Sequence, residues 1–422
     1  MTSVPFGQRS SACDQRVASS IPARLTKFFC NLTTARWLIK LALRTWLLGV
    51  GLSITTAANT QVVVLPFENL SGRQQYHWLS EGLALGLSDL LSLPGVQVIT
   101  PEERQAVYRL LALPETAVLS RASAIRVAQE VGADLLLMGT YNVAGSTGQE
   151  QITLSVQSVD VRAGKLAQSP FEAGAPLAEL LELEGILAWD ILVGQKVLLT
   201  VPRNQFVTRL RGIHPRTFEL YTKAVLTQDL STKAKLLRLA LKQQEQLKSD
   251  TKFFPAVYEF GKVHFLREDH AAAVPWLSQI KPGTLYYPDA QFYLGLCYLA
   301  LGDLDKAAAL YAELSRAAPT AGVLNNWAVV EIKRRQLTRA IDYLTVALAM
   351  DEGNPDLWFN AGYAYWLNGD YEQATIKFRQ ALDRRIKDGE AHYLLAKSYE
   401  KMGRAQSAHV AREEAKKYLP TV

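Results

Sequence analysis

Four residues that could ligate a metal lie close together in the sequence: His264, Glu268, Asp269 and His270. Imidazole nitrogens and carboxylate oxygens are common zinc ligands, and a zinc site needs such ligands at close spacing. The helical pattern of this segment places His264 at a packing position and His270 beyond the following turn, so their side chains should diverge. We therefore expect neither a metal site here nor a cofactor.

No other motif indicates catalysis. The sequence contains no phosphate-binding loop, dinucleotide-binding fingerprint or nucleophile elbow, and its remaining histidines stand apart from any paired nucleophile. The chain is therefore interpreted as non-enzymatic. Because catalytic groups can converge from distant segments, an unrecognised enzyme stays open as an alternative.

The cysteines exclude a disulfide framework. Of the three, Cys13 and Cys30 lie in a segment that we expect to be removed, which leaves Cys297 alone in a helical pattern. A single cysteine at such a position is typical of a buried thiol.

The positive charge of the chain is concentrated at its N-terminus. The net charge is +6, and residues 1–58 contribute all of it, with seven basic residues against the single acid Asp14. The remaining residues are balanced, whereas a nucleic-acid-binding protein needs a dense basic face. We expect no nucleic-acid partner.

The length of 422 residues favours two folded domains.

Residues 1–58 have the pattern of a secretory signal peptide. Lys40 and Arg44 precede an apolar stretch at 46–54, far shorter than the roughly 20 residues of a membrane-spanning helix, and small residues follow up to Ala58. We expect cleavage after Ala58, or retention as an inner-membrane signal anchor, the only membrane contact expected. A downstream translation start and a buried helix of a cytoplasmic protein are the alternatives. The signal predicts export to the periplasm or the bacterial cell envelope.

Residues 59–200 predict a small α/β domain with a mixed sheet and helices on one or both faces. Apolar runs and alternating patterns predict its strands, and apolar residues at helical spacing predict its helices. The predicted strands are 61–67, 96–99, 135–143, 152–161 and 165–171, and the predicted helices are 76–91, 102–112, 121–131 and 177–193.

The order of these segments carries a family resemblance. The opening VVVLPFENLSG, the helix ending in LLSLPGVQVI, and the later VAQEVGADLLLMGTYNV and SVDVRAGKL resemble the TolB-like N-terminal domain, related to envelope proteins of the FlgO and CsgG type. The resemblance implies no catalytic residues. Asn69, Ser71 and Gly72 could line a ligand cleft at the end of the first strand, because open α/β sheets bind ligands there. The alternative is a structural turn.

Self-similarity at a fixed period dominates the rest of the chain. Gly261, Gly295, Ala328, Gly362 and Ala396 recur at spacings of 34, 33, 34 and 34 residues. An alanine follows each of them twelve residues later, and small residues at both places let paired helices cross closely. The pattern resembles the tetratricopeptide repeat, with five units at 254–420, a degenerate unit at 217–250 and a linker at 201–216. The predicted architecture is an α/β domain followed by an all-α superhelix of tetratricopeptide repeats.

In that family a concave groove is lined by the first helix of each repeat. The resemblance places an exposed, largely aromatic row there, which reads as a groove for a partner segment, because aromatic side chains supply much interface energy. The alternative is that neighbouring repeats or the TolB-like domain cover these residues. The predicted groove residues are Tyr258, Lys262, Phe265, Phe292, Leu296, Leu299, Asn325, Val329, Ile332, Lys333, Phe359, Tyr363, Trp366, Tyr393, Lys397 and Lys401.

These features together predict a protein-interaction scaffold or adaptor of the bacterial envelope, with a protein or peptide as its partner. A second hypothesis makes the α/β domain a sensor of a small ligand or glycan that is read out through the repeats.

Overall fold

The computed structural model describes residues 60–419 apart from 115–117, 248–250, 283 and 285. The predicted signal segment, with Cys13 and Cys30, lies outside the described residues. The chain divides between Tyr287 and Pro288 into two compact units. Among the described helices, none combines the length and the apolar character that crossing a membrane requires.

The first unit is built on a mixed sheet. Strand β1 (Thr60–Val64) runs parallel to β3 (Val96–Val98) on one side and to β4 (Leu135–Ala144) on the other. β4 then pairs along its whole length with the antiparallel strand β5 (Gln151–Asp160), as expected for two long runs joined by a glycine turn. The shorter strands extend the sheet: β2 (Glu68–Asn69) pairs with β4, while β6 (Lys165–Leu166) and β7 (Phe171–Pro176) pair with β5.

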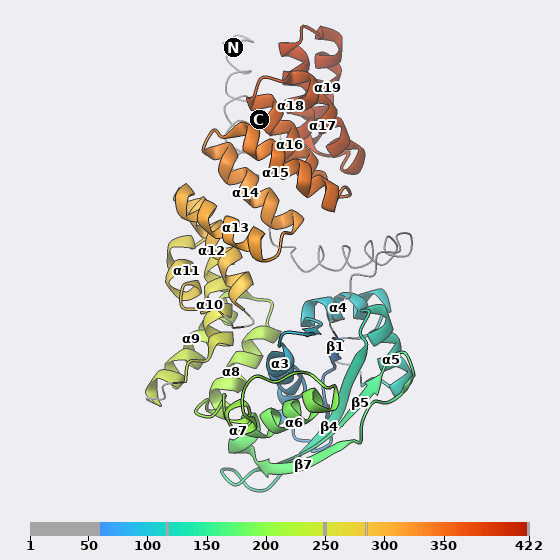
Figure 1. Ribbon diagram of the computed structural model, residues 1–422, viewed down its shortest axis with the longest axis vertical. Helices are drawn as coiled ribbons and strands as arrows, with labels where there is room; N and C mark the ends of the chain where they lie inside the picture. Colours follow the sequence, from blue (N-terminus) through green and yellow to red (C-terminus); the bar gives the residue numbers. More distant parts are fainter. Residues whose placement is uncertain (1–59, 115–117, 248–250, 283, 285, 420–422) are drawn as a thin grey trace, which may run out of the picture. The chain divides into compact units, whose positions relative to one another are not determined.

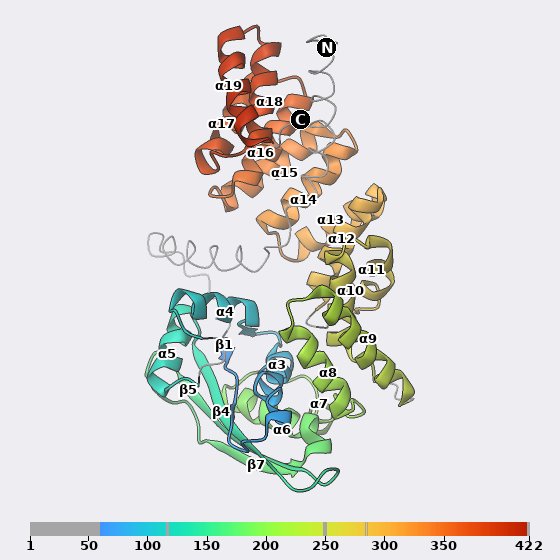
Figure 2. The same cartoon turned by 180° about the vertical axis from the view of Figure 1, so that it is seen from behind.

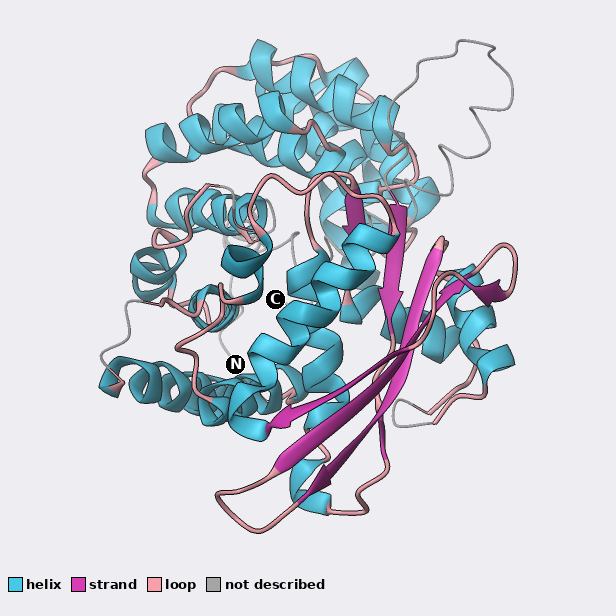
Figure 3. Cartoon of the chain, turned by 60° about the horizontal axis from the view of Figure 1, so that its bottom comes forward, coloured by secondary structure: helices cyan, strands magenta, loops and turns pink. Residues whose placement is uncertain are grey.

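Helices cover both faces of this sheet (Figure 3). One hydrophobic core lies between the sheet and helices α3 (Leu79–Leu91) and α6 (Leu180–Gly194). A second, smaller core lies on the other face, under α4 (Pro101–Leu110) and α5 (Arg121–Glu130). The alternation in β1 explains the arrangement, because Val62 and Val64 enter the first core whereas Val63 enters the second. The predicted α/β architecture is confirmed.

Two helix starts show how the local sequence sets the boundaries. Thr100 caps α4, since its hydroxyl accepts from the Glu103 amide at 3.2 Å and the Glu103 carboxylate accepts from the Thr100 amide at 2.9 Å. Ser120 caps α5 by accepting from the Ser123 amide at 3.2 Å. The predicted strand 165–171 is wrong in one respect, because it is split into β6 and β7. Pro170 lies between them and has no N–H for strand pairing.

Helical pairs complete the first unit. Short helices η1 (Gln74–Tyr76) and η2 (Leu177–Glu179) precede α3 and α6. The helices that follow the sheet are α7 (Arg203–Val207), α8 (Pro215–Leu226), α9 (Leu230–Gln246), α10 (Phe254–Leu266) and α11 (His270–Leu277) (Figure 1).

Helix α8 is packed into the core of the α/β domain. The rings of Trp78 and Phe218 meet edge to face with centroids 6.0 Å apart, and Phe218 in turn contacts Phe253 at 6.2 Å. Phe206, in the segment predicted as a linker, is buried in the same core. The stretch 201–216 therefore contains helix α7 and core residues, and the helical pairs α8–α11 belong to the same compact unit as the sheet.

The described part of the second unit consists of helices, each in contact with its neighbour along α13–α19 (Figure 2). Gly302, Gly369 and Gly403 lie in turns between helices and have φ of +82°, +81° and +72°, a conformation that glycine adopts without strain. The helices are α12 (Tyr287–Leu301), α13 (Leu304–Ala317), α14 (Ala321–Lys333), α15 (Leu337–Met350), α16 (Pro355–Leu367), α17 (Tyr371–Arg384), α18 (Gly389–Lys401) and α19 (Ala405–Tyr418).

Candidate protein-interaction surface

The small residues of the repeat pattern lie where paired helices cross. A Cβ atom added to Gly295 would lie 2.6 Å from the Tyr311 ring, and one added to Gly362 would lie 2.7 Å from the Phe378 ring. Such separations are far below van der Waals contact, so only glycine allows these helices to approach as they do. The alanines at the second small position are buried throughout: Ala273, Ala307, Ala340, Ala374 and Ala408. The packing reason predicted for both positions is confirmed.

The predicted row of exposed groove residues is wrong over much of its length. Phe292 and Phe359 are 3% and 0% exposed, because their rings pack on Tyr311 and Phe378 of the paired second helices, at centroid distances of 6.0 and 5.8 Å. Tyr258 is buried as well and stacks on Tyr286 at 5.0 Å. The other predicted groove residues that are buried are Leu296, Leu299, Asn325, Val329 and Ile332.

The accessible part of the predicted groove lies mainly on α14, α16 and α18. Tyr363, Trp366, Tyr393 and Lys397 are half-buried, while Lys333 and Lys401 are exposed, and these six residues are here named the α14–α18 surface. Lys262 and Phe265, also half-buried, are the accessible predicted residues of the first unit.

The aromatic side chains of the α14–α18 surface are held by one another and by cations. Tyr363 and Trp366 stack with their planes 8° apart and their centroids at 6.3 Å. Burial raises the pKa of Tyr363, and the Arg335 guanidinium partly offsets that rise. The Lys397 ammonium lies 5.5 Å from the centre of the Tyr393 ring, which is within the range of a cation–π contact. The surface therefore presents flat aromatic faces beside positive charges.

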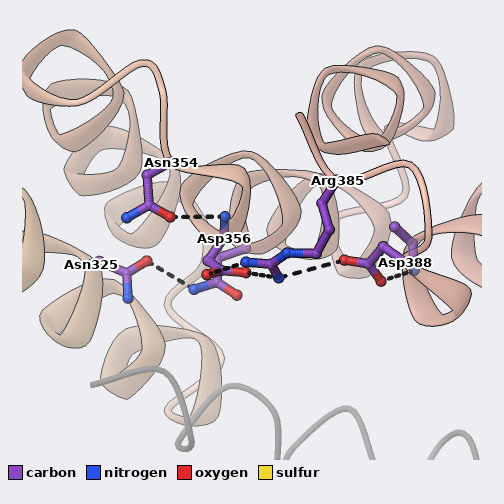
Figure 4. A network of polar contacts seen from close by, with 7 residues as sticks. Asn325, Asn354, Asp356, Arg385 and Asp388 are labelled. Carbon is purple, nitrogen blue, oxygen red and sulfur yellow. Dashed lines mark hydrogen bonds and ion pairs between the residues drawn. The ribbon is translucent and has the colours of Figure 1, made fainter. Parts of the chain in front are cut away.

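A buried polar network connects the repeats that carry this surface (Figure 4). The Asn360 amide on α16 donates to the Asn325 carbonyl on α14 at 2.8 Å. Arg385, just after α17, donates to both carboxylate oxygens of Asp356 at 2.6 and 3.0 Å, and its guanidinium lies 3.8 Å from Asp388. These contacts link three successive first helices, so they fix the spacing at which the surface residues are presented.

Two further contacts in Figure 4 set the helix starts: the Asn354 side chain accepts from the Asp356 amide at 3.0 Å, and Asp388 accepts from the Ala391 amide at 3.0 Å. Sequence reasoning missed Asn360, Asp356 and Arg385. A signal was present, because Asn326 and Asn360 stand 34 residues apart, one repeat length, at a position that holds Glu259, Tyr293 and Leu394 in the other units.

In the turn after β2, the polar groups bond to one another. The Asn69 side-chain oxygen accepts from the amide of Ser71 at 2.9 Å and from its hydroxyl at 2.6 Å. The Ser71 hydroxyl accepts from the Arg73 amide at 3.2 Å, and Gly72 has a φ of +65°. These contacts account for the residue types of the turn without a ligand.

The side chains of His264, Asp269 and His270 contact residues close to them in the sequence. His264 meets the Phe260 ring edge to face at 4.8 Å, and its Nδ1 lies 3.3 Å from an Asp269 oxygen. His270 lies against Phe265, and burial lowers the pKa of its imidazole. Within the described ranges, no three His, Cys, Asp or Glu side chains are grouped as a metal site requires. Cys297 is buried, as predicted, and burial raises the pKa of its thiol to about 12.

Comparison with known proteins identifies the repeats. The family model for the tetratricopeptide repeat matches residues 283–322 and 325–389, so the C-terminal region of the chain contains tetratricopeptide repeats. No curated protein sequence matches the chain.

Several solved structures are similar to part of the chain. One titled MamA AMB-1 is 24% identical, with a TM-score of 0.34, over 39% of this chain and 90% of its own. Another, titled MamA RS-1 ArsTM double mutant, is 15% identical, with a TM-score of 0.37, over 39% of this chain and 93% of its own.

Proposed function

We propose that this chain is a non-catalytic protein-interaction scaffold that binds a segment of a partner protein on the α14–α18 surface. The observation that carries the proposal is the set of half-buried aromatic rings and neighbouring lysines on three successive first helices. Such residues anchor most protein interfaces, because a ring buries a large area at a small cost in conformational entropy.

The rigidity of the repeats supports the same proposal. The Asn325–Asn360 hydrogen bond and the Asp356–Arg385 ion pair hold the first helices in a fixed register before any partner arrives. A preformed surface loses little entropy on binding, so more of the contact energy appears as affinity. Tetratricopeptide repeats serve widely as such scaffolds, which agrees with the match of the family model to residues 283–389.

The predicted secretory signal and the TolB-like resemblance motivate the cellular setting. We propose that the chain works in the bacterial envelope, where its α/β domain and its repeats contact different proteins. Mass spectrometry of the mature N-terminus is the direct test, and a chain that begins at Met1 in the cytoplasmic fraction would contradict the proposed export.

The binding proposal is tested with a photo-reactive amino acid at Tyr363 in the full-length chain, expressed in its own host. We expect a discrete cross-linked partner, lost when Trp366 is changed to Ser. The matched control places the same amino acid at Ile376, an exposed position on α17 outside the surface (48% exposed). Equal cross-linking from both positions, or none from Tyr363, would contradict a specific site.

A further inference from the structure

Asp89, near the end of α3, connects the α/β domain to the helical pairs of the first unit. Its carboxylate accepts a hydrogen bond from the hydroxyl of Tyr286, which lies 197 residues further along the chain. The Tyr286 ring is itself held by stacking on Tyr258 of α10. The contact therefore joins the sheet-covering helix α3 to the segment that follows α11.

The charged and titratable groups around Asp89 come from every element packed there. Arg209, after α7, donates to the Asp89 backbone carbonyl at 3.3 Å, and its guanidinium lies 4.5 Å from the centre of the Phe206 ring. Tyr221 of α8 interacts with the Tyr286 hydroxyl. The negative charge of Glu259 on α10 also raises the pKa of Asp89. Lys233 and Lys262 each lie 3.3 Å from the Glu259 carboxylate and neutralise its charge.

A second acid lies in the same interface. Glu184 of α6 is 0% exposed, and neither of its carboxylate oxygens has a hydrogen-bond partner among the described residues. It lies against Gly86 of α3, where any side chain would overlap its carboxylate. A Cβ added to Gly82, one turn earlier on α3, would lie 3.3 Å from the hydroxyl of the buried Thr222 of α8, so α8 packs on the same helix as α6.

Both acids favour their neutral forms in this setting. Burial raises the pKa of Asp89 to about 7, against the lowering effects of the Tyr286 hydrogen bond and of Arg209. Burial and the nearby Asp89 raise the pKa of Glu184 well above its usual range. A carboxylate with a pKa near 7 changes its charge within the physiological range, which an exposed Asp does not.

We propose that Asp89, Glu184 and Tyr286 form a proton-operated latch, which docks α8–α10 firmly on α3 and α6 when the acids are neutral and loosens them when the acids ionise. This inference is independent of the α14–α18 surface. It gives the interface between the α/β domain and the first helical pairs two states that differ in proton occupancy.

The direction of the effect follows from proton linkage. The docked state holds a proton on Asp89 between pH 3.8 and about 7, whereas the undocked, solvated carboxylate does not. Docking is therefore fully favoured below pH 3.8 and weakens as the pH rises, by at most about tenfold per pH unit for one proton. The weakening of docking that comes from Asp89 levels off above pH 7. Ionisation of Glu184 weakens docking further, in the same direction.

Hydrogen exchange of the full-length chain, read by mass spectrometry from pH 5.5 to 8.5 and corrected for intrinsic rates, tests the latch. We expect protection of α8 and α10 to fall as the pH rises from 5.5 to about 7, while α14–α18 serves as an internal reference. Asp89→Asn should abolish most of the pH dependence in this window and leave α8 more protected than in the wild type at pH 7. Asp342→Asn, an exposed Asp on α15, is the matched control and should change nothing.

A second variant separates titration from a merely structural contact. Because the Tyr286 hydroxyl lowers the pKa of Asp89, Tyr286→Phe should move the midpoint of the exchange transition to higher pH. Protection that does not vary with pH in the wild type, a pH dependence below pH 7 that survives in Asp89→Asn, or an unshifted midpoint in Tyr286→Phe would each overturn the proposal.

Discussion

Arg385 holds Asp356 through two parallel hydrogen bonds, so the end of one helical repeat is fixed to the start of its own first helix. Asp356 is 7% exposed, whereas the Arg385 side chain is 39% exposed, so the guanidinium covers a buried carboxylate from the surface of the second unit. Bidentate guanidinium–carboxylate pairs are strong and directional, whereas the more exposed ion pairs of this unit are weak.

Removing the guanidinium should therefore destabilise the second unit. We expect Arg385→Met to lower the free energy of unfolding by about 1–3 kcal/mol, because it leaves a buried carboxylate without its counter-charge. Urea unfolding followed by circular dichroism measures the effect. The control is Arg404→Met, which removes an exposed pair with Glu372 at 3.1 Å and should cost less than about 0.5 kcal/mol. Equal losses in the two variants would argue against a special role for Arg385.

The crossing of α16 and α17 makes a second prediction. Gly362→Ala should destabilise the second unit by about 1–3 kcal/mol, because the added methyl group overlaps the Phe378 ring in a closely packed pair. Gly353→Ala is the control, since a Cβ there meets a single neighbour at 3.7 Å. Differential scanning calorimetry compares the two variants, and the prediction is wrong if both melt at the wild-type temperature.

The buried ion pair of the α/β domain makes a third prediction. The Arg104 guanidinium bonds the Glu81 carboxylate and donates to the Val64 carbonyl at 2.9 Å, at the end of β1. Arg104→Met alone should cost about 3–5 kcal/mol, because it strands a buried charge. The double variant Arg104→Met with Glu81→Leu should recover most of that loss. Additive losses in a double-mutant cycle would contradict this coupling.

Cys297 makes a fourth prediction. A thiol whose pKa is raised to about 12 is almost entirely protonated at pH 8, and the protonated form is a poor nucleophile. Iodoacetamide should leave Cys297 unmodified in the native protein and alkylate it fully in urea, as read by peptide mass mapping. Rapid native labelling at pH 8 would show that α12 opens far more readily than its burial indicates.

The parts of the fold that sequence predicted correctly rest on local patterns. Gly295 and Ala307 are small because two helices of one repeat cross there, and a fixed period reveals that requirement without any knowledge of the tertiary structure. The strands β4 and β5 were predicted for the same reason. Their residue patterns and the glycine turn between them lie within thirty residues of each other.

The parts that failed depend on distances between separate elements. The repeat frame assigns Phe359 to the first-helix face that lines the groove, but only the actual approach of Phe378 shows that its ring is covered. The contact of Asp89 with Tyr286 joins residues 197 positions apart and follows no period, so no sequence pattern predicts it. The predicted groove residues that remain accessible after this covering are the α14–α18 surface, with Lys262 and Phe265 in the first unit.

Phe218 of α8 packs against Trp78 in the core of the α/β domain, and this packing limits how such chains can change during evolution. Repeat arrays usually lengthen, shorten or change partners by gene shuffling, because each pair of helices tolerates a new neighbour. Here the helical pairs α8–α9 and α10–α11 depend on the α/β domain for part of their core. Replacing that domain with another would leave Phe218 and Tyr221 exposed to water. Recombination that preserves folding is expected after Tyr287, and the ancestry of α8–α11 should follow that of the sheet rather than that of the later repeats.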